Sequence, residues 1–203
     1  MRVLEMFELI TSVFAIVVFL VIAGSIALYT LRNGSPPMPT SPKVKKELLS
    51  IVRRIETHGC IVEMGSGWGT LIFPVAGIFP SVAIHGYENS PIPCLFSKCR
   101  KIASSFFPTS KQNCRHLEIH REDFFHAPLT DVGMVICYLS PPAMEKLKTK
   151  FEKELHPGSF VVSNTFAVPG WMPEQVIEVP DLYRTKIYVY RLDGIHPQCL
   201  GKA

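Results

Sequence analysis

Ile61-Val-Glu-Met-Gly-Ser-Gly-Trp-Gly69 is the stretch of this chain that decides its fold. A short apolar run carries an acid, Glu63, and glycines then alternate at positions 65, 67 and 69. Glycine tolerates positive φ and lets a ligand approach bare backbone. The stretch therefore predicts a buried strand that breaks into a tight turn and opens a helix, at a site for a nucleoside-type cofactor.

The residues around this turn alternate between apolar segments typical of strands and segments with helical periodicity. Such alternation indicates βαβ units and a parallel sheet covered on both faces. No helical segment separates the last two strands, so they are expected to form an antiparallel hairpin. The prediction is an α/β, Rossmann-like, seven-stranded sheet that is mostly parallel. After the strand that begins at Ile61, strands are expected at 82–87, 116–120, 132–138, 159–163, 175–179 and 186–191, and helices at 43–57, 71–79, 91–107 and 140–155.

The N-terminal segment from Leu9 to Leu31 carries no charged residue over 23 positions. A helix of that length extends about 34 Å, enough to cross the hydrocarbon core of a bilayer. We therefore predict one transmembrane helix, with a cleaved signal peptide and a buried core helix as the alternatives. Basic residues are concentrated after the span, beginning with Arg32, which predicts a single-pass membrane protein whose remaining residues lie on the cytoplasmic side.

Three parts are expected along the chain. Residues 1–32 form the N-terminal tail and anchor, residues 33–46 a proline-rich linker, and residues 47–203 the globular domain. The net charge of +4 comes with no basic stripe interleaved with aromatic residues, so nucleic-acid binding is not predicted. The six cysteines form no C-x-x-C pair, which predicts reduced thiols and no metal site.

Two features of the glycine turn bear on the cofactor. The dinucleotide fingerprint is G-x-G-x-x-G, whereas the spacing here is G-x-G-x-G, with Thr70 at the place of the third glycine. An acid before the turn, Glu63, disfavours a pyrophosphate and favours a cationic ligand. S-adenosylmethionine carries an ammonium and a sulfonium and has no phosphate, so it is the cofactor that these residues favour.

From about Glu47 to Leu192 the chain resembles the class I, seven-β-strand methyltransferases that use S-adenosylmethionine. The motifs are the glycine turn, Glu88 after the second strand, and Glu122-Asp123 after the third. The resemblance implies that Glu63 helps to hold the amino-acid end of the cofactor, that Glu88 accepts hydrogen bonds from both ribose hydroxyls, and that Asp123 takes the adenine amino group. The implied cofactor-binding set is Glu63, Gly65, Ser66, Gly67, Trp68, Gly69, Glu88, Asn89, Asp123 and Phe124.

A narrower resemblance is to the membrane-anchored protein-lysine methyltransferases, the group that modifies the ATP synthase c-subunit or the adenine nucleotide translocase. It rests on the anchor, the glycine turn, Gly86-Tyr-Glu88 and Phe166-Ala-Val-Pro-Gly-Trp-Met-Pro173. The chain departs from the Asp/Asn-Pro-Pro-Tyr/Phe motif of other amine methyltransferases, because Ser140 and Ala143 occupy its first and last positions. This disfavours adenine or glutamine as the acceptor.

The expected function is transfer of a methyl group to lysine in a membrane or membrane-proximal protein. Tyr138, Ser140 and Trp171 are the candidates for the acceptor pocket. Each of the histidines at 85, 120, 126 and 156 is expected to be structural, and no general base stands out. Two alternatives stay open: a small or lipid-borne acceptor such as a quinone or a phospholipid headgroup, and a non-catalytic membrane-bound protein that binds the cofactor.

Overall fold

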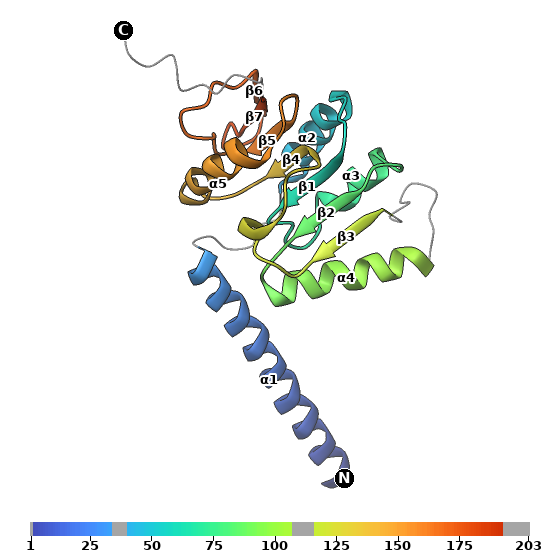
Figure 1. The fold of residues 1–203 in the computed structure, drawn as a ribbon. Coiled ribbons are helices and arrows are strands. Elements are labelled where there is room, and N and C mark those ends of the chain that lie inside the picture. The colour runs from blue at the N-terminus through green and yellow to red at the C-terminus, as the bar shows by residue number, and fades with distance from the viewer. Residues whose placement is uncertain (1, 34–39, 107–115, 193–203) are drawn as a thin grey trace.

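The computed structural model describes residues 2–33, 40–106 and 116–192. A long helix, α1 (Arg2–Asn33), projects from a globular part in which helices cover both faces of one sheet (Figure 1). The strands are β1 (Cys60–Met64), β2 (Ile84–Tyr87), β3 (Leu117–His120), β4 (Val132–Cys137), β5 (Phe160–Asn164), β6 (Gln175–Glu178) and β7 (Lys186–Arg191).

The seven strands lie in the order β3-β2-β1-β4-β5-β7-β6. The first five strands along the chain pair in parallel, and β7 pairs antiparallel with both β5 and β6. The predicted mixed sheet with its C-terminal antiparallel hairpin is therefore confirmed. The strand order reverses between β1 and β4, and ligands of open α/β sheets bind beyond the carboxyl ends of the strands at such a switch point.

Two apolar layers hold the helices to the sheet. On one face, α2 (Pro42–Arg54), α3 (Ile72–Ile78) and α4 (Pro91–Phe106) contribute Leu48, Phe73 and Cys94 to the core. On the other face, α5 (Pro141–Glu154) contributes Leu147 and Phe151. Between β3 and β4 the chain forms only a short 3-10 turn, η1 (Phe124–His126). The chain therefore has no α-helix between β3 and β4, and one face of β2 and β3 is left more open than the rest of the sheet.

The helix α2 belongs to the globular part from its first turn. Ser41 caps it, with its hydroxyl oxygen accepting from the Val44 backbone N–H at 3.4 Å. Both Val44 and Leu48 are buried in the core. The expected boundary at residue 47 falls inside this helix, and the packed structure begins at Pro42.

The segment Leu4–Arg32 of α1 is long and apolar enough to cross a membrane, and its most apolar 18-residue window has a mean hydropathy of 2.7. A signal sequence near the N-terminus can meet the same criterion. None of its most apolar window is buried, which argues against the core-helix alternative. Near its C-terminal end, Ser25, Ile26, Tyr29 and Thr30 are half-buried on one face, where α1 contacts α4.

The described cysteines, at 60, 94, 99 and 137, are all free, in agreement with the expectation of reduced thiols. Cys114 and Cys199 lie outside the described residues, as do positions 34–39 of the expected linker.

Candidate cofactor and acceptor site

The glycine turn has the backbone that its sequence predicted. Gly65, Gly67 and Gly69 all have positive φ, at 74°, 51° and 72°. The backbone N–H groups of Gly65 and Ser66 both donate to the Tyr87 carbonyl, at 2.9 and 3.0 Å. These bonds fix the turn beyond the carboxyl ends of β1 and β2, beside the switch point of the sheet.

Two of these glycines are required for different reasons. At Gly69, an added Cβ would lie 2.6 Å from Cε2 of Phe73, so the absence of a side chain lets α3 pack against the turn. At Gly67, an added Cβ would meet no heavy atom closer than 4.0 Å. Gly67 therefore presents bare backbone to open space, as a close-lying ligand requires.

Glu88 follows β2 and is only 6% exposed. One of its carboxylate oxygens accepts from the Gly67 N–H at 2.9 Å and the other from the Ser90 N–H at 2.7 Å. A carboxylate offers about four lone-pair sites, so two remain for the hydroxyls of a cis-diol. Glu88 therefore also ties the glycine turn to the end of β2, a structural role that its sequence position did not reveal.

Glu63 lies on β1 and is 8% exposed. Burial raises the pKa of its carboxyl well above the usual value, the charge of Glu88 raises it further, and a backbone hydrogen bond from Ile72 opposes both. Its Oε2 atom and the hydroxyl of Ser66 are buried, and neither has a hydrogen-bond partner among the described residues. Buried polar atoms are normally paired, so these two fit a ligand that brings cationic N–H donors to the turn.

Asp123 follows β3, as predicted, and caps η1 through a bond from the Phe125 N–H to its Oδ1 at 3.0 Å. The capping bond uses one carboxylate oxygen and leaves the second for a ligand. Phe124 is half-buried against the core beside it, with its ring 4.6 Å from that of Phe125.

The two remaining members of the predicted cofactor set lie within the turn and after β2. Trp68 is half-buried and makes an edge contact with Phe96 of α4, with 5.5 Å between the ring centroids. Asn89 lies next to Glu88, and its Oδ1 accepts from the Ser90 hydroxyl at 3.4 Å.

The segment after β4 lies against the glycine turn. The Leu139 side chain lies so close to Gly65 that an added Cβ there would come within 2.9 Å of it. Tyr138 and Ser140 are the neighbours of Leu139 in sequence, so both lie next to the turn. Ser140 is the N-cap residue of α5, but its side chain makes no capping bond. The ring of Tyr138 stacks on Phe166, at 6.4 Å between centroids and 18° between planes.

Trp171 is held in the packing behind α5. Its indole N–H donates to Glu152 at 3.0 Å, and its ring packs against Phe151 and Tyr190 at 6.1 and 5.7 Å between centroids. The aromatic residue of this loop that faces Tyr138 is Phe166. Phe166 opens the loop motif noted in the sequence but is not one of the three predicted acceptor residues.

The sheet order, with an acid and a glycine turn at its switch point, defines a class I S-adenosylmethionine-dependent methyltransferase. The structure of an RNA methyltransferase from Salinibacter ruber, in complex with S-adenosyl-L-homocysteine, has the same fold, with a TM-score of 0.68 and 22% identity over 81% of this chain and 100% of that one. A precorrin-6y C5,15-methyltransferase from Geobacter metallireducens matches with a TM-score of 0.54 and 13% identity, over 77% and 93% of the two chains.

Sequence comparison defines the family more narrowly. The model of the ANTKMT methyltransferase domain matches residues 63–175, and the chain belongs to this family. A protein-lysine N-methyltransferase of Saccharolobus islandicus is 29% identical over 147 residues, which cover 72% of this chain and 86% of the relative. The mouse adenine nucleotide translocase lysine N-methyltransferase is 28% identical over 170 residues, covering 82% and 67%. The protein is thus an enzyme of this family with S-adenosylmethionine as its methyl donor.

Proposed function

We propose that this enzyme transfers a methyl group to the side-chain amine of lysine in a membrane or membrane-proximal protein. The observation that carries the lysine assignment is the similarity to two lysine N-methyltransferases over most of this chain. One of those relatives is named for the adenine nucleotide translocase, which favours a membrane-protein substrate here as well.

The proposed cofactor site is built on β1 and β2. Glu63 and the Ser66 hydroxyl would accept from the ammonium of the cofactor, and Glu88 would accept from its ribose hydroxyls. Asp123 would receive the adenine amino group. The bound cofactor supplies an electrophilic methyl group on sulfur, and the protein needs only to align it, exclude water and admit a neutral amine.

The proposed acceptor pocket lies where the segment after β4 meets the glycine turn. The stacked rings of Tyr138 and Phe166 form an apolar wall for the alkyl stem of lysine. The Tyr138 and Ser140 hydroxyls can accept a hydrogen bond from the amine and direct its lone pair at the methyl group. The cofactor would supply the methyl group to the amine held by these two hydroxyls, and the amine would release one proton to water for each methyl group that it receives.

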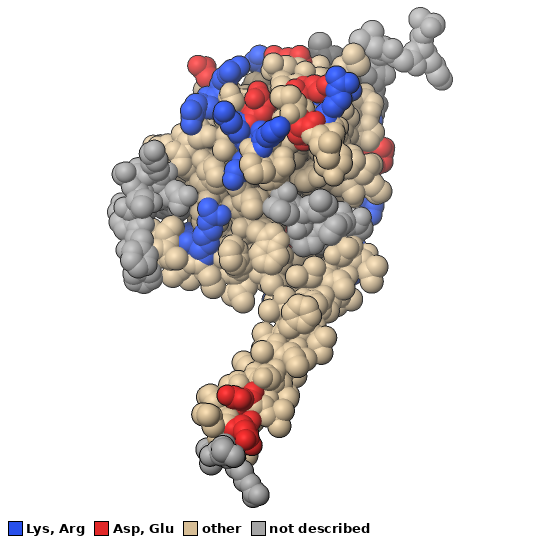
Figure 2. All heavy atoms as spheres, turned by 180° about the vertical axis from the view of Figure 1, so that it is seen from behind, with Lys and Arg blue, Asp and Glu red and all other residues tan. Residues whose placement is uncertain are grey.

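Membrane attachment through α1 is the second part of the proposal. Figure 2 shows acidic side chains at the free end of α1 and a long stretch without charge between them and the globular part. The acids are Glu5 and Glu8; Arg2 precedes them, and the next basic residue along the chain is Arg32. This asymmetry favours a cytoplasmic globular domain. Adding a protease outside sealed vesicles that carry the protein would test the orientation, because the protease digests only the part of the protein that faces outward.

The acceptor is tested by methyl transfer from radiolabelled S-adenosylmethionine into membranes of cells that lack the protein. Label is expected in protein, on methylated lysine identified by mass spectrometry. Label confined to the lipid extract would refute the lysine assignment and favour a quinone or phospholipid acceptor, and no transfer to either fraction would favour a non-catalytic protein. The Tyr138→Phe variant tests the acceptor pocket itself, since it removes one proposed amine contact and keeps the ring stacked on Phe166.

A further inference from the structure

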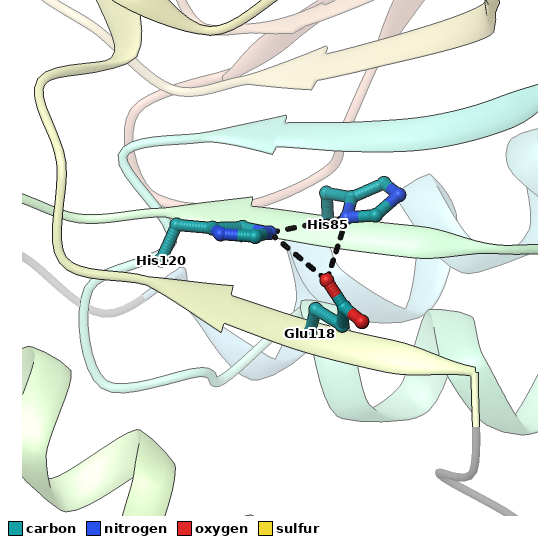
Figure 3. A group of neighbouring side chains, drawn as sticks. All are labelled: His85, Glu118 and His120. Atoms are coloured by element: carbon teal, nitrogen blue, oxygen red, sulfur yellow. Dashed lines mark hydrogen bonds and ion pairs between the residues drawn. The ribbon is translucent and has the colours of Figure 1, made fainter.

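Three side chains with metal-binding atoms meet on the open face of β2 and β3. Nδ1 of His85 lies 3.1 Å from Nε2 of His120, and Oε2 of Glu118 lies 3.6 and 3.5 Å from these two nitrogens (Figure 3). Only the shortest of the three distances is that of a hydrogen bond. Two ligands at 2.0–2.2 Å from one tetrahedral metal ion are themselves about 3.3–3.6 Å apart, close to this triangle.

The backbone holds this triangle in place. His85 and Glu118 are directly paired residues of adjacent parallel strands, and His120 follows two positions along β3 on the same face. The ring of His120 also stacks on Tyr87, at 4.8 Å between centroids and 18° between planes, which fixes its orientation. The donor atoms therefore converge without any rearrangement of the chain.

The chemistry of the donors favours a transition metal. Two imidazoles and one carboxylate suit Zn²⁺ and similar ions better than Mg²⁺ or Ca²⁺. The side chain of Glu118 is 60% exposed, so water can complete the coordination.

We propose that His85, Glu118 and His120 form a binding site for a divalent transition-metal ion of the Zn²⁺ type. The two histidines lie 35 positions apart in sequence, and no short motif revealed them. A bound ion would clasp edge strand β3 to β2. Glu88 and Asp123 lie three positions beyond His85 and His120, so the ion would also hold together the strand ends that present two proposed cofactor residues.

The test is titration of the purified, tag-free, full-length protein with Zn²⁺ by calorimetry, and with Co²⁺ by absorption spectroscopy. We expect one ion per chain, a Co²⁺ spectrum of nitrogen and oxygen ligands without thiolate bands, and a higher Tm for the metal-loaded protein. Loss of outer-shell partners of a metal typically costs 10–100-fold in affinity, so His120→Ala, which removes a ligand, should weaken binding by at least ~100-fold.

Two further variants keep the test decisive. Glu118→Gln changes an exposed side chain and endangers folding least, and it should also weaken binding. His156→Ala removes an exposed histidine outside the cluster and should leave binding unchanged. No stoichiometric binding, or equal binding by all these variants, would mean that the ion is adventitious and would overturn the proposal.

A second, independent observation concerns the outer face of α4. Leu95, Phe96 and Ile102 are 60%, 52% and 58% exposed, and the exposed Cys99 lies between them on the same face. The helix contains no acidic residue, and an exposed lysine, Lys98, borders this apolar face. Exposed apolar residues beside basic ones are typical of helices that lie in the interface of a bilayer.

The position of α4 relative to α1 indicates what contacts this apolar face. The two helices touch where the last turns of α1 are half-buried, and the remainder of α1 extends away from the globular part on the side where α4 lies (Figure 1). We infer that α4 rests in the headgroup region of the membrane that α1 crosses, an inference that depends on the proposed anchor. The Trp68–Phe96 contact then places the cofactor turn next to the lipid surface.

The experiment uses the full-length protein in vesicles of phosphatidylcholine and phosphatidylserine, with an environment-sensitive fluorophore on Cys99 and the other reactive cysteines replaced by serine. Lipids brominated in the acyl chains should quench the label at least ~2-fold, because interfacial helices sit about 5–10 Å into the boundary region. The same label at Lys153→Cys, an exposed position on α5, should not be quenched.

The outcomes separate the two membrane proposals. Absence of quenching at Cys99 in a protein that stays with the vesicles after alkaline washing overturns the role of α4 and leaves the anchor intact. Release of the protein by the alkaline wash overturns the anchor, and with it the placement of α4.

Discussion

Replacing Glu63 with glutamine should weaken cofactor binding and, at the same time, stabilise the free protein. The substitution preserves the shape of the side chain and removes its charge. In the free protein the carboxylate is destabilising, since it is 8% exposed, has one buried oxygen without a partner among the described residues, and lies close enough to Glu88 for that charge to raise its pKa. The ammonium of the bound cofactor, which we propose contacts Glu63, would offset this destabilisation.

The magnitudes follow from the loss of one buried, charged hydrogen bond. Such bonds contribute about 1.5–3 kcal/mol, which corresponds to cofactor binding weaker by about 10–150-fold. Relief of the buried charge in the free protein should contribute about 1–2 kcal/mol, or roughly 2–8 °C in Tm for a chain of this size. The two effects have opposite signs, and a merely damaging substitution would not produce both.

The pH dependence supplies a further check. The folded-state pKa of Glu63 lies above the unfolded value of about 4.3, so the destabilisation is absent below that value and grows as pH rises through the folded pKa. The Tm difference between Glu63→Gln and the wild type should therefore narrow as pH falls from about 8 to about 5. Cofactor affinity of the wild type should rise over the same range with increasing pH.

Calorimetry with S-adenosyl-L-homocysteine measures the affinities, and differential scanning fluorimetry measures the Tm values. Glu152→Gln is the matched control, because Glu152 is a half-buried acceptor in the packing around Trp171 and should leave cofactor affinity unchanged. If Glu63→Gln bound the ligand as tightly as the wild type, or melted at a lower temperature, the role assigned to Glu63 would be refuted.

Three further outcomes are expected. Glu88→Gln should lower stability by about 1.5–3 kcal/mol as well as weaken cofactor binding, because it sets an amide NH₂ against one of two backbone N–H donors; unchanged chemical unfolding would contradict this. Gly69→Ala should cost about 2–4 kcal/mol in the same assay, from positive φ and the overlap with Phe73. Burial raises the pKa of Cys137 to about 12, so alkylation of the native protein near pH 8, mapped by mass spectrometry, should modify Cys99 and spare Cys137.

Sequence patterns predicted the features that depend on residues close together in the chain. Apolar segments alternating with helical ones indicated the parallel sheet, and three alternating glycines indicated a turn that indeed has positive φ at each. Acids at strand ends could be placed by the same logic. Asp123 has a second role that its place after a strand did not reveal, because its carboxylate caps η1 while one oxygen is left for a ligand.

The features that sequence did not reveal depend on contacts between distant segments. The turn that begins at Thr165 determines which aromatic residue of the loop after β5 faces Tyr138. Thr165 has a φ of 70°, which residue propensities do not predict for threonine. That turn directs Phe166 toward Tyr138, whereas Trp171 turns back onto α5. The second bond of Glu88, to the Gly67 N–H, likewise arises only once β1 and β2 are paired.

The connection between β3 and β4 links these observations. Residues 121–131 are too few for the dozen or more that a helical crossover requires, so only η1 forms there and no helix covers this face of β2 and β3. A sheet face without a covering helix would ordinarily carry solvated polar residues without order. Here it carries two histidines and a carboxylate at ligand spacing, with a tyrosine stacked on one of them. The metal would then take over from the absent helix in holding the edge strand, and removal of the ion should loosen β3 before the rest of the sheet. Hydrogen exchange of the β3 amides that increases on chelation, with that of β4 unchanged, is the expected sign, and uniform exchange in both strands would contradict it.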